Sequence, residues 1–221
     1  MARFVITGTG TDIGKTVFAA GLTGLIGADY WKPVQTGVAA PDPFPRAAWT
    51  GGAHDPVPGS DADFVRRMTG ARIHPEAMIL PEPLSPHRAA ELAGVTINPA
   101  ALVPPVADPL VIEGAGGVLV PVTRQLMSAD LFARWGIPVI VVASTGLGTI
   151  SHTVTALESL AARHVPVHGL AFVGDDNPDN IATIARITGA RVLGRLPRLD
   201  ALTPEALAAA MRAHFDPQDF A

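Results

Sequence analysis

The residues best suited to chemistry lie near the start of the chain, in the segment Gly8-Thr9-Gly10-Thr11-Asp12-Ile13-Gly14-Lys15-Thr16. The apolar residues 3–6 before this segment predict a buried strand, and residues 17–22 after it predict the start of a helix. Glycines let backbone N–H groups face a polyphosphate, and a helix N-terminus adds partial positive charge. The segment therefore predicts a phosphate-binding loop, in which Lys15 reaches the β- and γ-phosphates and Thr16 binds Mg²⁺.

This loop departs from the general pattern G-x-x-x-x-G-K-[ST] by one residue, because five residues rather than four separate Gly8 from Gly14. The alternative is a glycine-rich turn between a strand and a helix that binds no ligand. The flanking elements and the intact Gly14-Lys15-Thr16 triplet favour a nucleoside triphosphate site instead.

A second lysine, Lys32, lies at the end of the next predicted strand, residues 29–34. Lysine at a strand end is commonly a solvated surface charge. In a parallel sheet, however, the end of this strand lies at the same edge as Lys15. Two lysines meeting there would neutralise an anionic substrate and a transferring phosphoryl group.

Two carboxylates are candidate metal ligands. Glu113 follows the buried run 109–112 and precedes a glycine-rich turn, which suits a Mg²⁺ ligand, although an edge charge or a helix cap remains open. Asp61 follows Ser60 at a predicted helix start, where capping is the ordinary role of such residues, and Asp63 is a rival for any metal role.

Strands and helices alternate along the chain around these residues. This order predicts an α/β fold of the P-loop NTPase type: a doubly wound, mostly parallel sheet with helices on both faces, in a single domain over residues 1–221. Ligands of such sheets gather at the carboxyl ends of the strands. The predicted strands are residues 3–6, 29–34, 109–112, 137–143, 167–173 and 191–193, with residues 118–120 extended. The predicted helices start near 17, 60, 85, 128, 151, 179 and 203, and we expect Ser60 and Ser128 to cap the helices that start at them. Residues 38–59 show no period and predict a long surface loop.

The composition narrows the class of protein. A hydrophobic content of 48% with 16% charged residues predicts a compact globule, and a net charge of −4 predicts no nucleic-acid partner. The chain has no cysteine, which excludes thiol catalysis, disulfides and cysteine-bound zinc. Met1 leads directly into a strand without a signal peptide, and residues 137–143 are too short to span a bilayer. We therefore expect a cytoplasmic protein that does not bind membranes.

Taken together, the motifs resemble the ATP-dependent dethiobiotin synthetases, whose phosphate loop carries the same extra residue. The matching blocks occur in family order and span most of the chain. They are residues 8–17, 32–37, 60–61, 85–87, 113–117 and 147–152, with fainter matches at 193–197 and 204–205.

The resemblance implies a reaction of biotin synthesis. Enzymes of this family convert 7,8-diaminononanoate (7,8-diaminopelargonate), CO₂ and MgATP into dethiobiotin, ADP and phosphate. A carbamate forms on one amine and is phosphorylated to a carbamic-phosphoric anhydride, and the second amine then closes the ureido ring. Because the carbamate is already a nucleophile, this chemistry needs positioning and charge neutralisation more than acid–base groups.

The resemblance also assigns roles to residues. Lys32 and Lys15 would hold the carbamate, with Lys15 also on the γ-phosphate, and Thr11 would hydrogen-bond near the same group. The implied Mg²⁺ ligands, direct or through water, are Thr16, Asp61 and Glu113. The implied ATP-binding residues are Asp12, Ile13, Gly14, Lys15, Thr16, Val17, Asp61, Glu113, Gly114, Ala115, Gly116, Gly174, Asp175, Pro197, Arg198, Leu199 and Glu205, of which those from Gly174 onward would line the base and ribose pocket.

Three further residues are implied to bind the diamine. Thr36 would contact it, and backbone groups of Thr149 and Ile150 would hold its carboxylate across a homodimer interface. One departure affects the nucleotide: the segment Val173-Gly174-Asp175-Asp176 stands where the family often has Asn-Asp to read adenine. We therefore expect a weak preference for adenine over other bases.

Two other classes of protein are alternatives. Partitioning-type ATPases are nucleotide-switched binding proteins with this loop type, but their signature lysine would fall at Gly10. A small-molecule kinase would usually carry an arginine-rich lid, and Arg66-Arg67 is the only adjacent arginine pair in the sequence.

Overall fold

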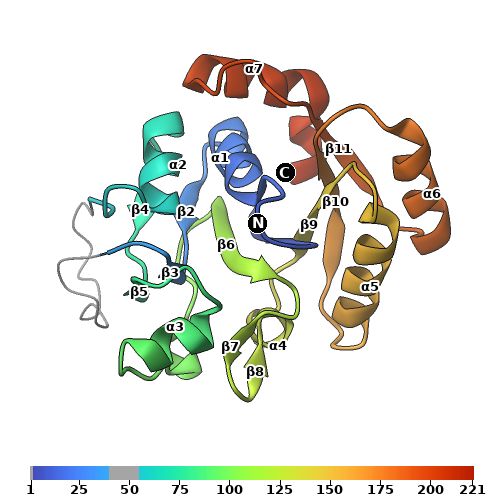
Figure 1. Ribbon diagram of the computed structural model, residues 1–221. Coiled ribbons are helices and arrows are strands. Elements are labelled where there is room, and N and C mark those ends of the chain that lie inside the picture. Colours follow the sequence, from blue (N-terminus) through green and yellow to red (C-terminus); the bar gives the residue numbers. More distant parts are fainter. Residues whose placement is uncertain (1, 40–54) are drawn as a thin grey trace.

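A parallel sheet forms the centre of the molecule. The computed structural model describes residues 2–39 and 55–221 (Figure 1). Within them, seven strands pair in the order β11-β10-β9-β1-β6-β2-β4, and every neighbouring pair is parallel. These strands are β1 (Arg3–Gly8), β2 (Asp29–Trp31), β4 (Ile73–His74), β6 (Leu110–Gly117), β9 (Val139–Ser144), β10 (Val167–Val173) and β11 (Val192–Leu196).

Both faces of this sheet are buried. In β1 the side chains of Phe4 and Ile6 belong to one apolar cluster, whereas Val5 between them belongs to another. Ile140 and Val141 of β9 divide in the same way. Strands covered on both faces are apolar at successive positions, which explains the continuous apolar runs in the sequence.

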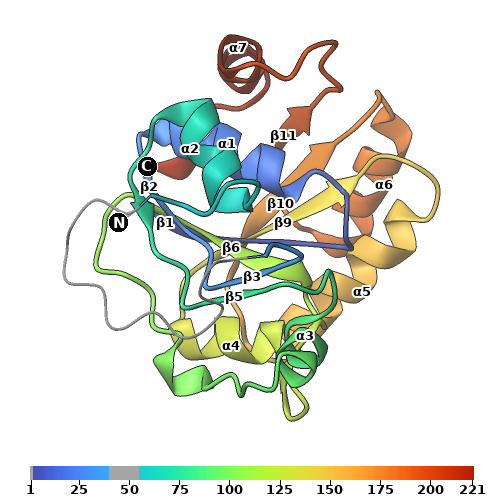
Figure 2. The same ribbon diagram turned by 60° about the vertical axis from the view of Figure 1, so that its left-hand side comes forward.

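The helices divide between the two faces (Figure 2). One face carries α1 (Lys15–Ile26), α2 (Asp61–Thr69), α7 (Pro204–His214) and the short 3₁₀ helix η2 (Pro217–Phe220). The other carries α4 (Ser128–Trp135), α5 (Thr149–Ala161) and α6 (Pro178–Thr188). The predicted doubly wound α/β architecture is therefore confirmed.

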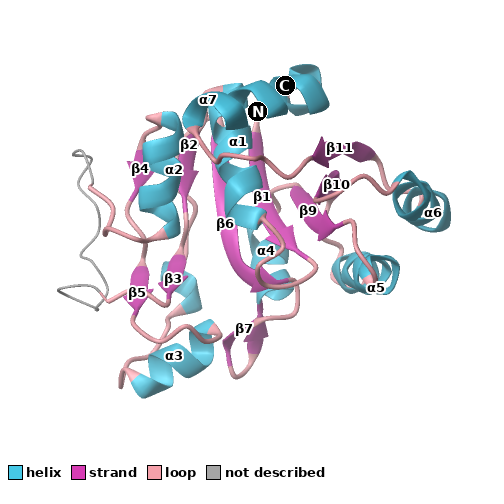
Figure 3. Cartoon of the chain, turned by 45° about the horizontal axis from the view of Figure 1, so that its top comes forward, coloured by secondary structure: helices cyan, strands magenta, loops and turns pink. Residues whose placement is uncertain are grey.

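A smaller layer lies beside the carboxyl end of β2 (Figure 3). It contains the parallel pair β3 and β5, the helix α3 and the antiparallel hairpin of β7 and β8, which share their own apolar cluster. The bounds are β3 (Val34–Thr36), β5 (Met78–Leu80), α3 (Pro86–Leu92), β7 (Pro121–Thr123) and β8 (Leu126–Met127), and the 3₁₀ helix η1 (Pro99–Ala101) precedes β6.

The predicted second strand, residues 29–34, is in fact two strands in two sheets. β2 ends at Trp31, and Val34 begins β3, which pairs with β5. Pro33 has no N–H to donate to a ladder, so the chain leaves the main sheet there. As a result, Lys32 lies between the two sheets.

Two other predictions of local structure are wrong. Residues 118 and 119 form a turn rather than extended chain, and Val120 N donates to Gly117 O at 3.1 Å. Ser128 does not cap α4; its hydroxyl donates to Val120 O, while the Asp130 carboxylate accepts from Met127 N at 2.8 Å. The cap predicted for α2 is confirmed, because Ser60 Oγ accepts from Asp63 N.

The predicted loop over residues 38–59 falls largely outside the described residues, which omit 40–54. None of the helices in the part of the chain that the structure describes is long and apolar enough to cross a membrane.

Candidate active site

The phosphate-loop segment connects β1 to α1 through two left-handed residues. Asp12 has φ 56° and Gly14 has φ 91°, and left-handed residues turn backbone N–H groups towards one concave side of such a loop. A Cβ atom on Gly14 would lie 2.7 Å from Cγ1 of Val173. Glycine is therefore required at position 14 by both its backbone angle and its packing.

Lys15 and Lys32 line the same cavity, of about 830 Å³, at the carboxyl ends of β1 and β2. Both side chains are nearly buried, with 8% and 6% of each residue exposed. Lys32 Nζ lies 3.1 Å from Glu113 Oε1 and also contacts the Asp61 carboxylate. Lys15 Nζ donates to Gly10 O at 2.7 Å. The structure thus brings the two predicted lysines to one site.

Glu113 is the centre of the polar contacts in this cavity. Its Oε1 atom accepts from Thr16 Oγ1 at 2.8 Å as well as from Lys32, and its Oε2 atom accepts from the Tyr30 hydroxyl at 2.8 Å. The residue is 1% exposed. A buried carboxylate with three donors is held in one orientation.

The surroundings shift the pKa values of the two lysines in opposite directions. Burial lowers the pKa of Lys15, and the nearby Lys32 charge lowers it further against the opposing effect of Glu113. Burial also acts to lower the pKa of Lys32, but Glu113 and Asp61 outweigh it and raise that pKa. Lys32 is therefore a firmly charged ammonium group, whereas Lys15 lacks a full counter-charge.

The oxygen atoms in this site fit Mg²⁺. Adjacent ligands of an octahedral Mg²⁺, each about 2.1 Å from the metal, lie about 3 Å apart, and Thr16 Oγ1 and Glu113 Oε1 are 2.8 Å apart. Asp61 and Glu113 already share one cation, the Lys32 ammonium. Among the described residues there is no group of three His, Cys, Asp or Glu side chains that could hold a metal alone. A metal here would need further oxygen atoms, which a nucleotide phosphate supplies.

Most other residues predicted for the reaction centre also line this cavity: Thr11, Asp12, Gly14, Thr16, Val17, Thr36, Ala115 and Gly116. Ile13 lies beneath the loop, where its Cδ1 atom would be 2.5 Å from a Cβ on Gly8. Gly114 packs against Phe132, whose Cζ atom would lie 2.9 Å from an added Cβ.

Sequence reasoning missed two residues of this site, Tyr30 and Gln35. Gln35 Oε1 accepts from Asp61 N at 3.1 Å, and its amide donates to Thr36 O at 2.8 Å, so it links β3 to the start of α2. The alternation of strand side chains could have indicated Tyr30, because it lies two residues before Lys32 on the same side of the chain.

The residues predicted to bind the base and ribose lie outside the cavity of Lys15 and Lys32. Gly174 N donates to Leu196 O at 3.0 Å, and Asp175 pairs with Arg198 at 3.1 Å on the surface. The Asn177 amide donates to Thr145 O at 3.0 Å and its Oδ1 caps α6. Neither these residues nor Pro197 and Leu199 line the cavity of Lys15 and Lys32.

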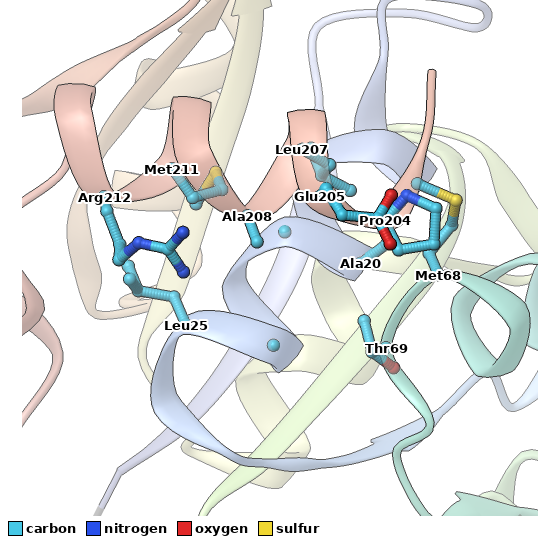
Figure 4. Close-up of a pocket in the computed structure, with 12 residues that line it drawn as sticks. Ala20, Leu25, Met68, Thr69, Pro204, Glu205, Leu207, Ala208, Met211 and Arg212 are labelled. Atoms are coloured by element: carbon cyan, nitrogen blue, oxygen red, sulfur yellow. The ribbon is translucent and has the colours of Figure 1, made fainter. Parts of the chain in front are cut away.

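Glu205 lies in the first turn of α7, beside a second cavity of about 480 Å³ between α1, α2 and α7 (Figure 4). Its walls include Ala20, Met68 and Arg212, and none of its lining residues lines the larger cavity. The assignment of Glu205 to the nucleotide stays a prediction.

Thr149 and Ile150, at the start of α5, are also absent from the walls of the larger cavity. Thr149 is buried, and its hydroxyl donates to Ser144 O. Leu147, just before this helix, is fully exposed. The predicted contact of these residues with a substrate in a partner subunit stays a prediction.

The loop geometry and the doubly wound parallel sheet together define a P-loop nucleotide-binding protein. The family model described as an AAA domain matches residues 2–206. One solved structure, the MinC:MinD cell division protein complex of Aquifex aeolicus, aligns with a TM-score of 0.54 over 96% of this chain and 94% of that one. At 11% identity this likeness shows the fold alone.

Full-length relatives identify the family. The chain is 50% identical to the ATP-dependent dethiobiotin synthetase BioD of Rhizorhabdus wittichii, over 98% of this chain and 97% of the relative. It is 48% identical to BioD of Sphingopyxis alaskensis over all of both chains, and 50% identical to BioD of Agrobacterium fabrum over 99% of this chain and 96% of the relative. The chain belongs to the ATP-dependent dethiobiotin synthetase family.

Proposed function

We propose that this protein is an ATP-dependent cyclo-ligase that converts 7,8-diaminononanoate, CO₂ and ATP into dethiobiotin, ADP and phosphate. Its family membership supports this reaction. The observation that carries the proposal is the meeting of Lys15 and Lys32 in one cavity beside Glu113 and Thr16. A carbamate and a γ-phosphate are both anions, and two buried ammonium groups would hold them together.

The electrostatics give the lysines different roles. Lys32, whose pKa is raised, binds the carbamate as a permanent cation. The pKa of Lys15 is lowered, so its charged form is less well stabilised by the protein alone. Binding of the γ-phosphate would stabilise that charged form. Thr11 and Thr36 line the same cavity and orient the carbamate and the diamine. Holding both reactants in place supplies most of the rate increase in such a reaction.

Mg²⁺ is the cofactor that this site would hold, with Thr16, Asp61 and Glu113 as its protein ligands. The metal would neutralise charge on the phosphates of ATP. The same two carboxylates contact Lys32, so they connect the metal site to the carbamate site through shared side chains.

The remaining predicted residues support a dimeric assembly. The enzyme is a cytoplasmic homodimer of single P-loop domains, in which the start of α5 in one subunit binds the substrate carboxylate held by the other. The exposure of Leu147 next to Thr149 and Ile150 supports this arrangement. The segments at Gly174, Pro197 and Glu205 would contact the base and ribose of the nucleotide.

The test is a phosphate-release assay with MgATP, bicarbonate and 7,8-diaminononanoate, omitting each component in turn. We expect release to require all three, with dethiobiotin formed in equal amount. Release that ignores the diamine would instead identify a nucleotide-switched ATPase.

A further inference from the structure

The Tyr30 hydroxyl is a buried group in the site to which no role has been assigned above. Tyr30 has no exposed surface, and its ring belongs to the apolar cluster that includes Phe18 of α1 and Val65 of α2. Its hydroxyl donates to Glu113 Oε2 at 2.8 Å. A phenol beside a carboxylate oxygen at this distance is the donor of the pair, because an ionised carboxylate can only accept.

The sheet fixes this contact. β2 pairs with β6 in the register Tyr30 with Val111 and Trp31 with Ile112, and Glu113 follows directly in β6. Tyr30 in β2 and Lys32 directly after this strand therefore approach Glu113 from the same side, and each donates to a different carboxylate oxygen. The packed ring leaves the hydroxyl no alternative position.

The two oxygens of Glu113 consequently differ. Oε1 faces Thr16 and Lys32, whereas Oε2 is held by Tyr30 inside the protein. A metal beside Thr16 would meet one oxygen of this carboxylate. Mg²⁺ accepts single carboxylate oxygens in an octahedral shell, while Ca²⁺ readily takes both oxygens of one carboxylate in a larger shell.

We propose that Tyr30 restricts Glu113 to a single metal-binding oxygen and so makes the site select Mg²⁺ over Ca²⁺. This inference rests on the proposed role of Glu113 as a metal ligand. Tyr30 is a positioning residue in this account, because it acts through Glu113 and contacts neither nucleotide nor metal.

The test is metal binding to the protein with ADP. Mn²⁺ is titrated in and followed by electron paramagnetic resonance, and Mg²⁺ and Ca²⁺ are used to displace it. In Tyr30→Phe the ratio of Ca²⁺ affinity to Mg²⁺ affinity should rise about tenfold, a usual effect of removing a partner of a metal ligand. The binding of both ions by ADP itself is common to all variants and cancels in the comparison. An unchanged ratio, with or without a general loss of affinity, would overturn the inference.

Trp31→Phe is the matched control. Trp31 is the next residue of β2, belongs to the cluster on the opposite face of the sheet, and donates from Nε1 to Pro75 O at 3.0 Å. This variant loses a hydrogen bond from the same strand and part of a buried ring, so it should lower stability at least as much as Tyr30→Phe while keeping the wild-type metal ratio. A rise of the ratio in the control would overturn the inference, because loosening of the strand alone would then explain it.

The measurement is independent of the ligase reaction, since it needs neither diamine nor CO₂. A wild-type protein that binds Mn²⁺ with ADP but forms no dethiobiotin would contradict the proposed function alone. A wild-type protein that binds no Mn²⁺ with ADP would overturn the inference about Tyr30.

Discussion

The predicted nucleotide site has a reaction end, around Lys15, Lys32 and Glu113, and a base end, around Asp175 and Arg198. The two ends are built in different ways. At the reaction end Lys15, Lys32 and Glu113 are each less than a tenth exposed, and the hydrogen bonds of Glu113 and Lys32 reach α1, α2, β2 and β6. At the base end Asp175 and Arg198 pair with each other on the surface. The first region is organised before any ligand arrives, whereas the second offers few fixed groups. The chemistry should therefore tolerate little change, and the choice of base should be loose.

The largest expected effect comes from Lys32→Ala. Loss of one fixed cation that stabilises developing charge costs about 10²–10³-fold in turnover, and the Lys32 side chain contacts both carboxylates of the site. Dethiobiotin formation should fall by at least this factor, while nucleotide binding, measured by calorimetry with Mg·ADP, should remain within a few-fold of wild type. Full activity in this variant would remove Lys32 from the reaction.

Gly14→Ala should come next. The substitution places a Cβ at φ 91° and 2.7 Å from Val173, and backbone strain of this kind costs about 1–3 kcal/mol. We expect a lower melting temperature and much weaker nucleotide binding. Gly146→Ala is the control, because a Cβ there meets no atom within 4 Å and the backbone is not left-handed. Equal losses in the two variants would contradict a special role of the phosphate loop.

Lys15→Met should separate stability from ligand binding. Burial lowers the Lys15 pKa below its usual value, so charging this group opposes folding. This free-energy cost of charging Lys15 is fully present below the pKa that Lys15 has in the folded protein. It decreases as pH rises from there towards the pKa of the unfolded chain. Without nucleotide the melting temperature of the variant at pH 7 should be at least that of wild type. The difference between the two melting temperatures should become smaller towards pH 10.

In the same thermal melts, added Mg·ATP should stabilise wild type and leave Lys15→Met unchanged, because the variant has lost its contact with the phosphates. A variant that melts well below wild type at pH 7 would contradict the electrostatic argument.

The smallest expected effect concerns the base. At the loop after β10 the Asn177 side chain is held by the fold, because its amide donates to Thr145 O and its oxygen caps α6. Initial rates with ATP, CTP and GTP at saturating diamine should therefore agree within about tenfold, which corresponds to about 1.4 kcal/mol. Strict dependence on ATP would show that the base end is more organised than its contacts indicate.

The parts of this molecule that follow general rules were predictable from the sequence. Continuous apolar runs marked the central strands, and the meeting of strand ends at one edge of a parallel sheet predicted that Lys15 and Lys32 converge. The contact between Tyr30 and Glu113 was not predicted, because it depends on the register of two strands and joins residues 83 positions apart in the sequence. The change of sheet at Pro33 was not predicted either, because it depends on pairing with the distant strand β5.

That change of sheet has a practical consequence for redesign. The proposed phosphate-binding loop follows β1 of the main sheet, whereas Thr36, which is proposed to contact the diamine, belongs to β3 in the smaller layer. The chain passes between the two layers more than once, from β2 to β3 next to Lys32 and again from β4 to β5, from α3 to β6 and from β6 to β7. Redesign for other diamines would therefore replace several segments of the smaller layer together and leave the strands of the main sheet unaltered.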